Sequence, residues 1–108
     1  MENLLTIEEI NHELSSSQAV LLYFYGNSCG VCSVIKEKLE IEMTKYPNIK
    51  SYKIFTESNM EAFAEFNIFT LPVVLFYIDG KEYIREARNI SVRDLLIDID
   101  RLYELYFN

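Results

Sequence analysis

Two cysteines, Cys29 and Cys32, are the residues of this chain best suited to covalent chemistry, and only Gly30 and Val31 separate them. At this spacing two sulfurs come within bonding distance across one helical turn, so a small disulfide ring closes with little backbone motion. We expect Cys29 at the N-terminus of a helix, where unpaired N–H groups and the positive end of the helix dipole stabilise a thiolate. Because the thiolate is the attacking form of cysteine, Cys29 is predicted to be the nucleophile. Cys32, predicted one turn inside the helix and more sheltered, would act second.

Two other uses of the cysteine pair remain open from the residues alone. Zinc prefers four ligands, and the chain supplies two cysteines and one histidine, His12, so a zinc site would need a second chain. A buried pair of thiols can also persist as part of the packing. His12 is expected to be an exposed helical residue, and we expect neither a metal nor another cofactor.

The elements on either side of the cysteines are predicted from hydrophobic patterning. Residues 19–25 form an unbroken apolar and aromatic run bounded by Gly26, which is typical of a strand buried on both faces of a parallel sheet. After Cys32, apolar residues recur at helical spacing with polar residues between them, which predicts an amphipathic helix ending near Pro47. The apolar positions of that helix are Ile35, Leu39, Met43 and Tyr46.

The rest of the chain continues the alternation of helix and strand. Capping boxes at residues 6–9 and 58–61 each predict a helix start, the first helix reaching about Ser15. The second box is expected to place Met60, Phe63 and Ala64 on one helix face. Strands are predicted at 49–55 and 72–78, and Asp79-Gly80 is a hairpin signal leading into a strand at 81–87. A final helix is expected from Ser91, and its buried side is expected to consist of Val92, Leu95, Leu96, Ile99, Leu102, Tyr103 and Tyr106.

This order, α-β-α-β-α-β-β-α, predicts an α/β protein with one domain over residues 1–108. Strands that alternate with helices form a parallel core through right-handed crossovers, and the closing hairpin adds an antiparallel edge. We therefore expect a mixed four-stranded sheet flanked by helices.

From Thr6 onward the chain resembles the thioredoxin family. The Cys29–Cys32 motif matches that family's active-site turn, and Thr70-Leu71-Pro72 matches its cis-proline loop, which faces the cysteines. Lys53 falls on the family's strand lysine and Gly80 on the glycine of its hairpin. The resemblance implies a thioredoxin fold and a thiol–disulfide oxidoreductase that reduces protein disulfides through a mixed disulfide. It also implies disulfide-containing protein substrates and a separate reductase that recycles the dithiol.

The same resemblance implies the members of the site. The catalytic set would be Cys29, Cys32, Pro72 and Lys53. The substrate groove would comprise Ser28, Gly30, Val31, Thr56, Phe69, Thr70 and Leu71. The backbone of Leu71 would pair with the substrate as an added strand. From the residues alone, the alternative for Pro72 is an ordinary proline that leads a strand, and the alternative for Lys53 is a solvated strand residue.

Four positions depart from the family pattern. Ser28 stands where the family has tryptophan, Val31 replaces its proline, Tyr23 its buried acid, and Arg88 the glycine of a loop near the site. Tyr23 is expected mainly as a core residue and Arg88 as a surface residue. An N-terminal edge strand is expected to be short or absent. These changes keep a second hypothesis open, a non-catalytic binding module that uses the groove around Pro72.

Charge and hydropathy narrow the classes of partner. The chain has 10 Lys and Arg against 17 Asp and Glu, a formal net charge of −7, which disfavours nucleic acid and anionic membranes as partners. Residues 1–9 lack a signal-peptide pattern, and the longest apolar run is too short to span a bilayer, so we expect a cytoplasmic protein. Tyr103, Tyr106 and Phe107 are expected in the core or at a dimer contact, in a monomer or weak dimer.

Overall fold

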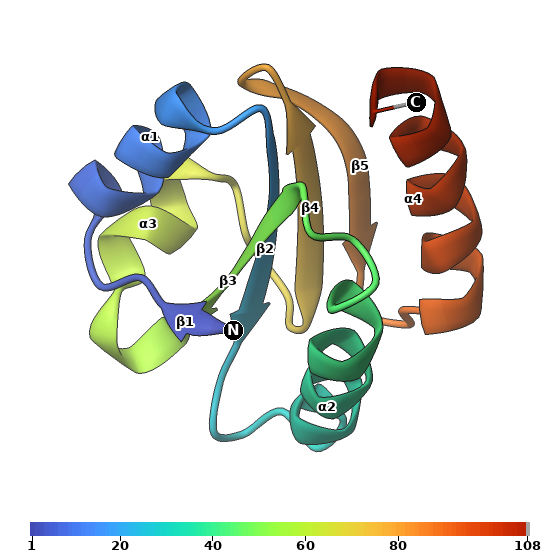
Figure 1. Ribbon diagram of the computed structural model, residues 1–108. Helices are drawn as coiled ribbons and strands as arrows, with labels where there is room; N and C mark the ends of the chain where they lie inside the picture. Colours follow the sequence, from blue (N-terminus) through green and yellow to red (C-terminus); the bar gives the residue numbers. More distant parts are fainter. Residues whose placement is uncertain (108) are drawn as a thin grey trace.

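A five-stranded mixed sheet forms the centre of the computed structural model, which describes residues 1–107 (Figure 1). The strands are β1 (Glu2–Asn3), β2 (Ala19–Tyr25), β3 (Ile49–Phe55), β4 (Val73–Ile78) and β5 (Lys81–Ala87), in the order β1-β3-β2-β4-β5. Strands β1, β3 and β2 run parallel, whereas β4 and β5 are antiparallel to their neighbours. The thioredoxin fold expected from the sequence is thereby confirmed, with five strands rather than four.

The additional strand is the N-terminal edge strand, and it is short, as expected. Strand β1 has two residues and pairs with Tyr52 and Lys53 of β3. Leu4, which follows it, donates its backbone N–H to the Lys53 carbonyl at 3.0 Å and buries its side chain. So short a segment carries no alternating pattern from which a strand can be predicted.

Helices cover both faces of the sheet. Helices α1 (Ile7–Ser16) and α3 (Met60–Glu65) lie on one face, and α2 (Cys32–Met43) and α4 (Val92–Phe107) on the other (Figure 1). Successive side chains of a strand point to opposite faces. Accordingly Leu21 and Tyr23 of β2 join the core beneath α2 and α4, whereas Leu22 and Phe24 join the core beneath α1 and α3. Burial on both faces explains the unbroken apolar run of β2.

One of the two predicted capping boxes is confirmed and the other is wrong. The Thr6 hydroxyl accepts from the Glu9 N–H at 3.1 Å, and the Glu9 carboxylate accepts from the Thr6 N–H at 3.0 Å. At the second position the chain first tightens into a 3₁₀ turn, η1 (Thr56–Ser58), so α3 begins at Met60 after Asn59 without a side-chain cap. The buried face of α3 consequently consists of Ala62 and Phe63, while Met60 is 73% exposed and Ala64 is exposed.

The hairpin and the last helix follow the sequence pattern closely. Asp79 and Gly80 both have positive φ angles, 52° and 77°, as a tight two-residue hairpin between β4 and β5 requires. In α4, Leu95 and Ile99 are fully buried, and Tyr103 and Phe107 pack against the same core. The prediction that Tyr106 lies on the buried side is wrong: Tyr106 is 39% exposed, and its hydroxyl is 3.0 Å from that of Tyr83. None of the helices within residues 1–107 combines the length and apolar character needed to cross a membrane.

Candidate active site

The two cysteines form a disulfide in the turn that connects β2 to α2. Their Cα atoms are 5.4 Å apart. The turn is held by backbone bonds from the Cys29 N–H to the Gly26 carbonyl, 3.4 Å, and from the Cys32 N–H to the Cys29 carbonyl, 3.3 Å. Helix α2 begins at Cys32 with Val31 as its N-cap, so the prediction that Cys32 lies one turn inside the helix is wrong. Gly30 and Val31, which were expected to be helical, form part of the turn that precedes α2.

The difference in accessibility between the two cysteines is nevertheless the expected one. Cys29 is half-buried, whereas Cys32 is only 2% exposed and belongs to the core. Cys29 lies two residues before Val31, the N-cap of α2, at the end of the helix where the positive end of the dipole acts. An incoming disulfide can therefore reach Cys29, while Cys32 is accessible mainly to Cys29 itself.

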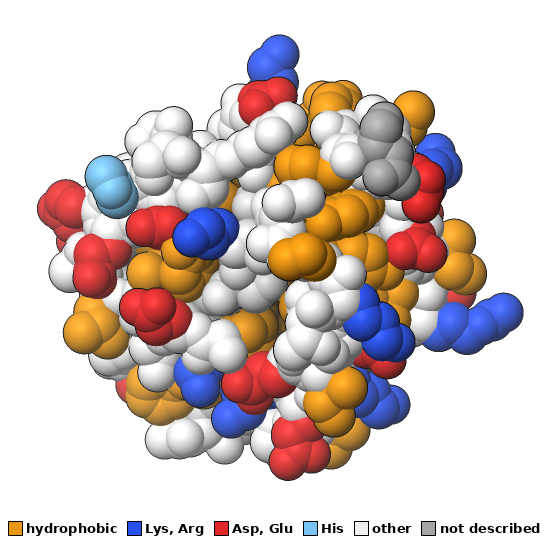
Figure 2. Space-filling model, viewed as in Figure 1, with side chains coloured by type: hydrophobic (Ala, Val, Ile, Leu, Met, Phe, Trp, Pro, Cys, Tyr) orange, Lys and Arg blue, Asp and Glu red, His pale blue; other side chains and the backbone are white. Residues whose placement is uncertain are grey.

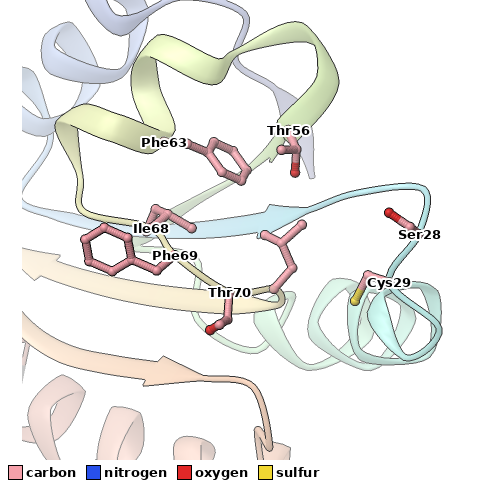
Figure 3. A pocket seen from close by; sticks show the side chains of 8 residues that line it. Ser28, Cys29, Thr56, Phe63, Ile68, Phe69 and Thr70 are labelled. Atoms are coloured by element: carbon pink, nitrogen blue, oxygen red, sulfur yellow. The ribbon is translucent and has the colours of Figure 1, made fainter.

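A hollow of about 350 Å³ opens beside Cys29 (Figure 3). It is lined by Ser28, Cys29, Thr56, Phe63, Ile68, Phe69, Thr70 and Leu71. Five of these residues were predicted as groove residues, and they come from the turn after β2, the start of η1 and the loop before β4. Phe63 and Ile68 were missed, although the apolar spacing of α3 already placed Phe63 on a buried face. Two predicted groove residues, Gly30 and Val31, lie outside this hollow.

The loop before β4 packs closely against the end of β2. A Cβ atom on Gly26 would lie 2.9 Å from Leu71 Cδ1 and 3.0 Å from Thr56 Oγ1, so a larger residue there would displace the ends of these two side chains. The Thr56 hydroxyl donates to the Tyr25 carbonyl at 2.6 Å. The Leu71–Pro72 peptide bond is cis, as expected, and Pro72 is buried. Strand β4 begins one residue later than predicted, at Val73, because proline has no N–H to donate.

The backbone of Leu71 is free to bind another chain. Its neighbour Pro72 accepts from the Arg88 N–H at 2.9 Å, but within residues 1–107 neither the N–H nor the carbonyl of Leu71 has a hydrogen-bond partner. Leu71 is half-buried and lines the hollow beside Cys29. An extended peptide lying in the hollow would find one donor and one acceptor there.

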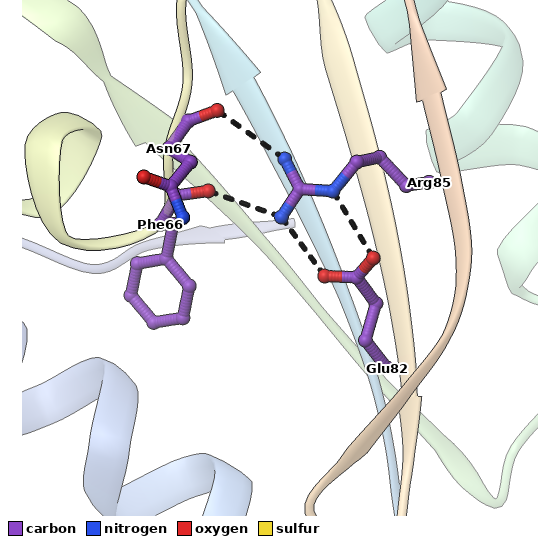
Figure 4. Close-up of polar contacts among 4 residues, drawn as sticks. All are labelled: Phe66, Asn67, Glu82 and Arg85. Atoms are coloured by element: carbon purple, nitrogen blue, oxygen red, sulfur yellow. Dashed lines mark hydrogen bonds and ion pairs between the residues drawn. The ribbon is translucent and has the colours of Figure 1, made fainter.

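Arg85 of β5 holds the other end of the same loop (Figure 4). Its guanidinium donates to the carbonyls of Phe66, at 3.0 Å, and Asn67, at 3.4 Å. Two further bonds, of 3.0 and 2.8 Å, join it to the Glu82 carboxylate, and this pairing raises the pKa of Arg85. The planar guanidinium thus fixes the end of α3 to β5, and with it the start of the loop that lines the hollow. No sequence pattern singled out Arg85 for this role.

Tyr23 lies beneath the cysteine pair and is fully buried. Its hydroxyl donates to the backbone carbonyl of Cys32 at 2.7 Å, so in this oxidised state the proton is directed to the peptide and not to sulfur. Burial raises the pKa of Tyr23 further above its already alkaline ordinary value. Tyr23 is therefore a neutral hydrogen-bond donor in the core, as the sequence suggested, and not a base.

Lys53 lies opposite Tyr23 in the register of β2 and β3 and is half-buried. Its charge acts on Glu40 of α2. The pKa of Glu40 is lowered chiefly by a hydrogen bond from the amino group of Met1, with the Lys53 and Lys36 cations contributing. Lys53 therefore places positive charge beneath α2, in an electrostatic cluster with Glu40.

A second hollow, of about 430 Å³, lies on the other side of the cysteine turn. It is lined by Val31, Val34, Ile35, Arg88, Asn89, Ile90 and Ser91. Val31 thus borders this hollow and not the one beside Cys29. Arg88 adopts a left-handed φ of 69°, a conformation that glycine takes without strain. Among residues 1–107, no group of three or more His, Cys, Asp or Glu side chains is placed to hold a metal ion.

The arrangement is suited to disulfide exchange. One sulfur is reachable from a hollow, its partner is sheltered behind it, and an unpaired backbone edge lies alongside. Attack on an external disulfide by the first sulfur can therefore be followed by attack from the second without diffusion of either group.

Comparison with known proteins agrees with this geometry. The family model described as Thioredoxin matches residues 3–100. Thioredoxin-like protein YdfQ of Bacillus subtilis is 32% identical over 106 residues, covering 98% of this chain and 95% of its own length. Thioredoxin H8 of Arabidopsis thaliana is 30% identical over 98 residues, 91% of this chain and 66% of that protein. The X-ray structure of Fasciola hepatica thioredoxin superposes with a TM-score of 0.84 at 25% identity, covering 94% of this chain and 98% of that one.

Proposed function

This chain belongs to the thioredoxin family of thiol–disulfide oxidoreductases, and on that premise we propose that it reduces protein disulfides through a Cys29–Cys32 dithiol cycle. The observation that carries the proposal is the asymmetry of the pair. Cys29 borders the hollow, whereas Cys32 is buried behind it.

In the first step the Cys29 thiolate attacks one sulfur of a substrate disulfide. A bond forms between Cys29 Sγ and that sulfur, the substrate S–S bond breaks, and the departing substrate thiolate takes a proton from solvent. Because attack requires the thiolate, the helix dipole ahead of α2 and the positive charge of Lys53 beneath it both favour this step.

In the second step Cys32 loses its proton to solvent and attacks Cys29 Sγ. The mixed disulfide breaks, the second substrate thiolate leaves and is protonated, and the Cys29–Cys32 disulfide forms. The substrate has gained two electrons and two protons, and the enzyme is left in the oxidised state of the present structure. A reductase of dithiol or equivalent two-electron chemistry must then restore the pair.

The substrate would lie in the hollow as an added strand. Leu71 would exchange backbone hydrogen bonds with it, while Ser28, Thr56, Phe69 and Thr70 would contact its side chains. Phe69 is 86% exposed, so it offers a large apolar surface to a bound chain. Gly30 and Val31 would contact the part of the substrate chain that extends past the cysteine turn, on the side away from the hollow. Pro72, buried behind Leu71, would lie against the sulfur pair.

We further propose that residues 1–108 form one domain, with Asn108 lying outside the described residues, and that the protein works in the cytoplasm as a monomer or weak dimer. In that compartment glutathione and thioredoxin systems keep most thiols reduced, so a CxxC pair is typically catalytic there.

Insulin reduction with dithiothreitol as electron donor tests the proposal. The wild-type protein should accelerate precipitation of the insulin B chain, and Cys29→Ser should abolish the acceleration. Ser33→Ala, an exposed position on the first turn of α2, is the matched control and should retain it. No acceleration by a folded wild-type protein would instead favour the non-catalytic binding module.

A further inference from the structure

Three hollows follow one another along the line between α2 and the first half of α4. The first is the second hollow described above, and the next two have volumes of about 510 Å³ and about 380 Å³. The last two share Glu42 and Leu96. We call this surface the α2–α4 groove. Beyond the residues of the second hollow, it is lined by Lys38, Ile41, Glu42, Lys45, Tyr46, Val92, Arg93, Leu96, Ile97 and Asp100.

The groove exposes apolar side chains that the core does not use. Val31, Val34 and Ile41 are 51%, 52% and 67% exposed, and Ile97 on the facing helix is 56% exposed. Residues 34, 38 and 41 fall at helical spacing, so they share one face of α2, distinct from the face that packs on the sheet, and the N-cap Val31 borders the same hollow as Val34. On the side of the molecule where α2 and α4 lie, Figure 2 shows hydrophobic side chains gathered, with Lys and Arg as well as Asp and Glu side chains around them. Such a patch next to a reactive site is typical of an interaction surface.

The charge of the groove is opposite to that of the whole chain. Four cations, Lys38, Lys45, Arg88 and Arg93, line it against two carboxylates, Glu42 and Asp100. Both carboxylates already have partners: Lys45 lies 2.7 Å from Glu42, and the hydroxyl of Tyr46 donates to Asp100.

Of the four cations that line the groove, Lys38, Arg88 and Arg93 have no ion pair within residues 1–107. In a protein with 17 acidic residues and 10 basic ones, this local excess of positive charge selects a negatively charged partner. A second copy of the chain fits poorly, because a two-fold contact would place these cations against one another.

We propose that the α2–α4 groove docks an acidic amphipathic helix of the protein whose disulfide is exchanged at Cys29. This inference rests on the proposed function and adds the class of partner. With 12 residues, α2 is about 18 Å long, which matches about three turns of a docked helix. Apolar side chains of that helix would contact Val34, Ile41 and Ile97, and its carboxylates would pair with Lys38 and Arg93. Because the groove begins at Val31, docking would hold the partner's disulfide near Cys29.

Fluorescence anisotropy of labelled synthetic peptides measures the docking directly. Two cysteine-free 18-residue peptides would carry the same leucines at helical spacing, with glutamates on the polar face of one and lysines on the other. The glutamate peptide should bind at least about tenfold more tightly than the lysine peptide at low salt, and the preference should shrink as salt rises. Lys38→Glu/Arg93→Glu should remove the preference for the glutamate peptide. Ile41→Ser should lower the affinity for the glutamate peptide by about fivefold.

Matched variants away from the groove are the controls. Lys50→Glu/Lys81→Glu makes the same change in net charge at exposed strand positions, and Met60→Ser removes an equally exposed apolar side chain from α3. Both should leave binding of the glutamate peptide within about twofold of wild type, apart from a small general charge effect. Equal binding of both peptides, or equal losses in groove and control variants, would overturn the docking proposal. So would self-association in sedimentation that Ile41→Ser abolishes, because the occupant would then be a second copy.

Reduction of 2-hydroxyethyl disulfide separates this proposal from the catalytic one. This small neutral substrate does not reach the groove, so Lys38→Glu/Arg93→Glu should reduce it as fast as wild type does. When the same glutamate peptide carries a disulfide at its N-terminal end, wild type should reduce it faster than the double variant does. Failure of wild type to reduce the small substrate would refute the proposed function, whereas the anisotropy result decides the docking surface independently.

Discussion

Tyr23→Phe removes a single hydroxyl from beneath the cysteine pair and leaves the aromatic packing in place. The Tyr23 hydroxyl donates to the Cys32 carbonyl at 2.7 Å, while the ring stacks parallel to that of Tyr25 with centroids 6.1 Å apart. The lost interaction is one neutral hydrogen bond to the backbone of Cys32, the cysteine that resolves the mixed disulfide. The substitution therefore tests whether the Tyr23 hydroxyl assists that step in place of the family's buried carboxylate.

The expected magnitude follows from the type of bond. A neutral hydrogen bond contributes about 1 kcal/mol, which corresponds to about a fivefold change in rate if the whole contribution is lost in the transition state. Burial raises the pKa of Tyr23 above its ordinary alkaline value, so the phenol stays protonated from pH 6 to 9 and cannot serve as a base. The resolving step should therefore slow by less than about tenfold, and it should still accelerate with pH up to the pKa of Cys32.

Stopped-flow decay of a mixed disulfide on Cys29, followed from pH 6 to 9, provides the measurement. Tyr25→Phe is a matched control on the same strand, because the Tyr25 hydroxyl donates to Asn3 at 3.2 Å and does not contact the cysteines. It should leave the rate unchanged. A hundredfold loss in Tyr23→Phe at neutral pH, or a changed pH profile, would show that the hydroxyl substitutes for the missing carboxylate.

Further predictions concern the sulfurs, the groove loop and the alkaline limit of stability. Cys32→Ser should accumulate a mixed disulfide detectable by mass spectrometry, and mild alkylation of the reduced protein should label Cys29 first; prior labelling of Cys32 would reverse the roles. Arg85→Ala removes the hydrogen bonds that hold the end of α3, so KM for insulin should rise about threefold. The free energy of unfolding measured in urea should fall by about 1 kcal/mol, and Arg85→Lys should give intermediate values. Burial and the hydrogen bond to Asp100 raise the pKa of Tyr46 to about 12, so stability should fall as pH rises from 10 to 12. Tyr46→Phe should make that part of the stability curve less steep, although the raised pKa of Tyr23 keeps part of the slope. Equal slopes for the variant and wild type in urea titrations would contradict the prediction.

The elements with strong local signals were predicted almost residue by residue. The bounds of β2 and β3 agree with the predicted 19–25 and 49–55, because seven-residue strands bounded by turn residues carry their own pattern. The hairpin at Asp79-Gly80 was equally clear, since few sequences adopt positive φ at two successive residues. The helix predicted to end near Pro47 ends at Met43, so Tyr46 is buried outside it. Two further errors lie where a tight turn competes with a helix start, at Ser58 and at Cys32. Local capping signals do not show whether the residues after a strand form a tight turn or the first turn of a helix.

The candidate active site likewise has some features that the sequence predicts and others that only the structure shows. The sequence alone determined that Cys29 and Cys32 form a close pair after a buried strand, because sequence spacing sets the distance between their Cα atoms. Only the tertiary structure brought Phe63 and Ile68 to the hollow, directed the Tyr23 hydroxyl to the Cys32 carbonyl, and tied Arg85 to the loop at Phe66. These contacts join segments from different elements, and packing of the whole sheet decides which of them meet. Local sequence carries periodicity and turn preference, whereas the partner of a buried polar group is set by the fold.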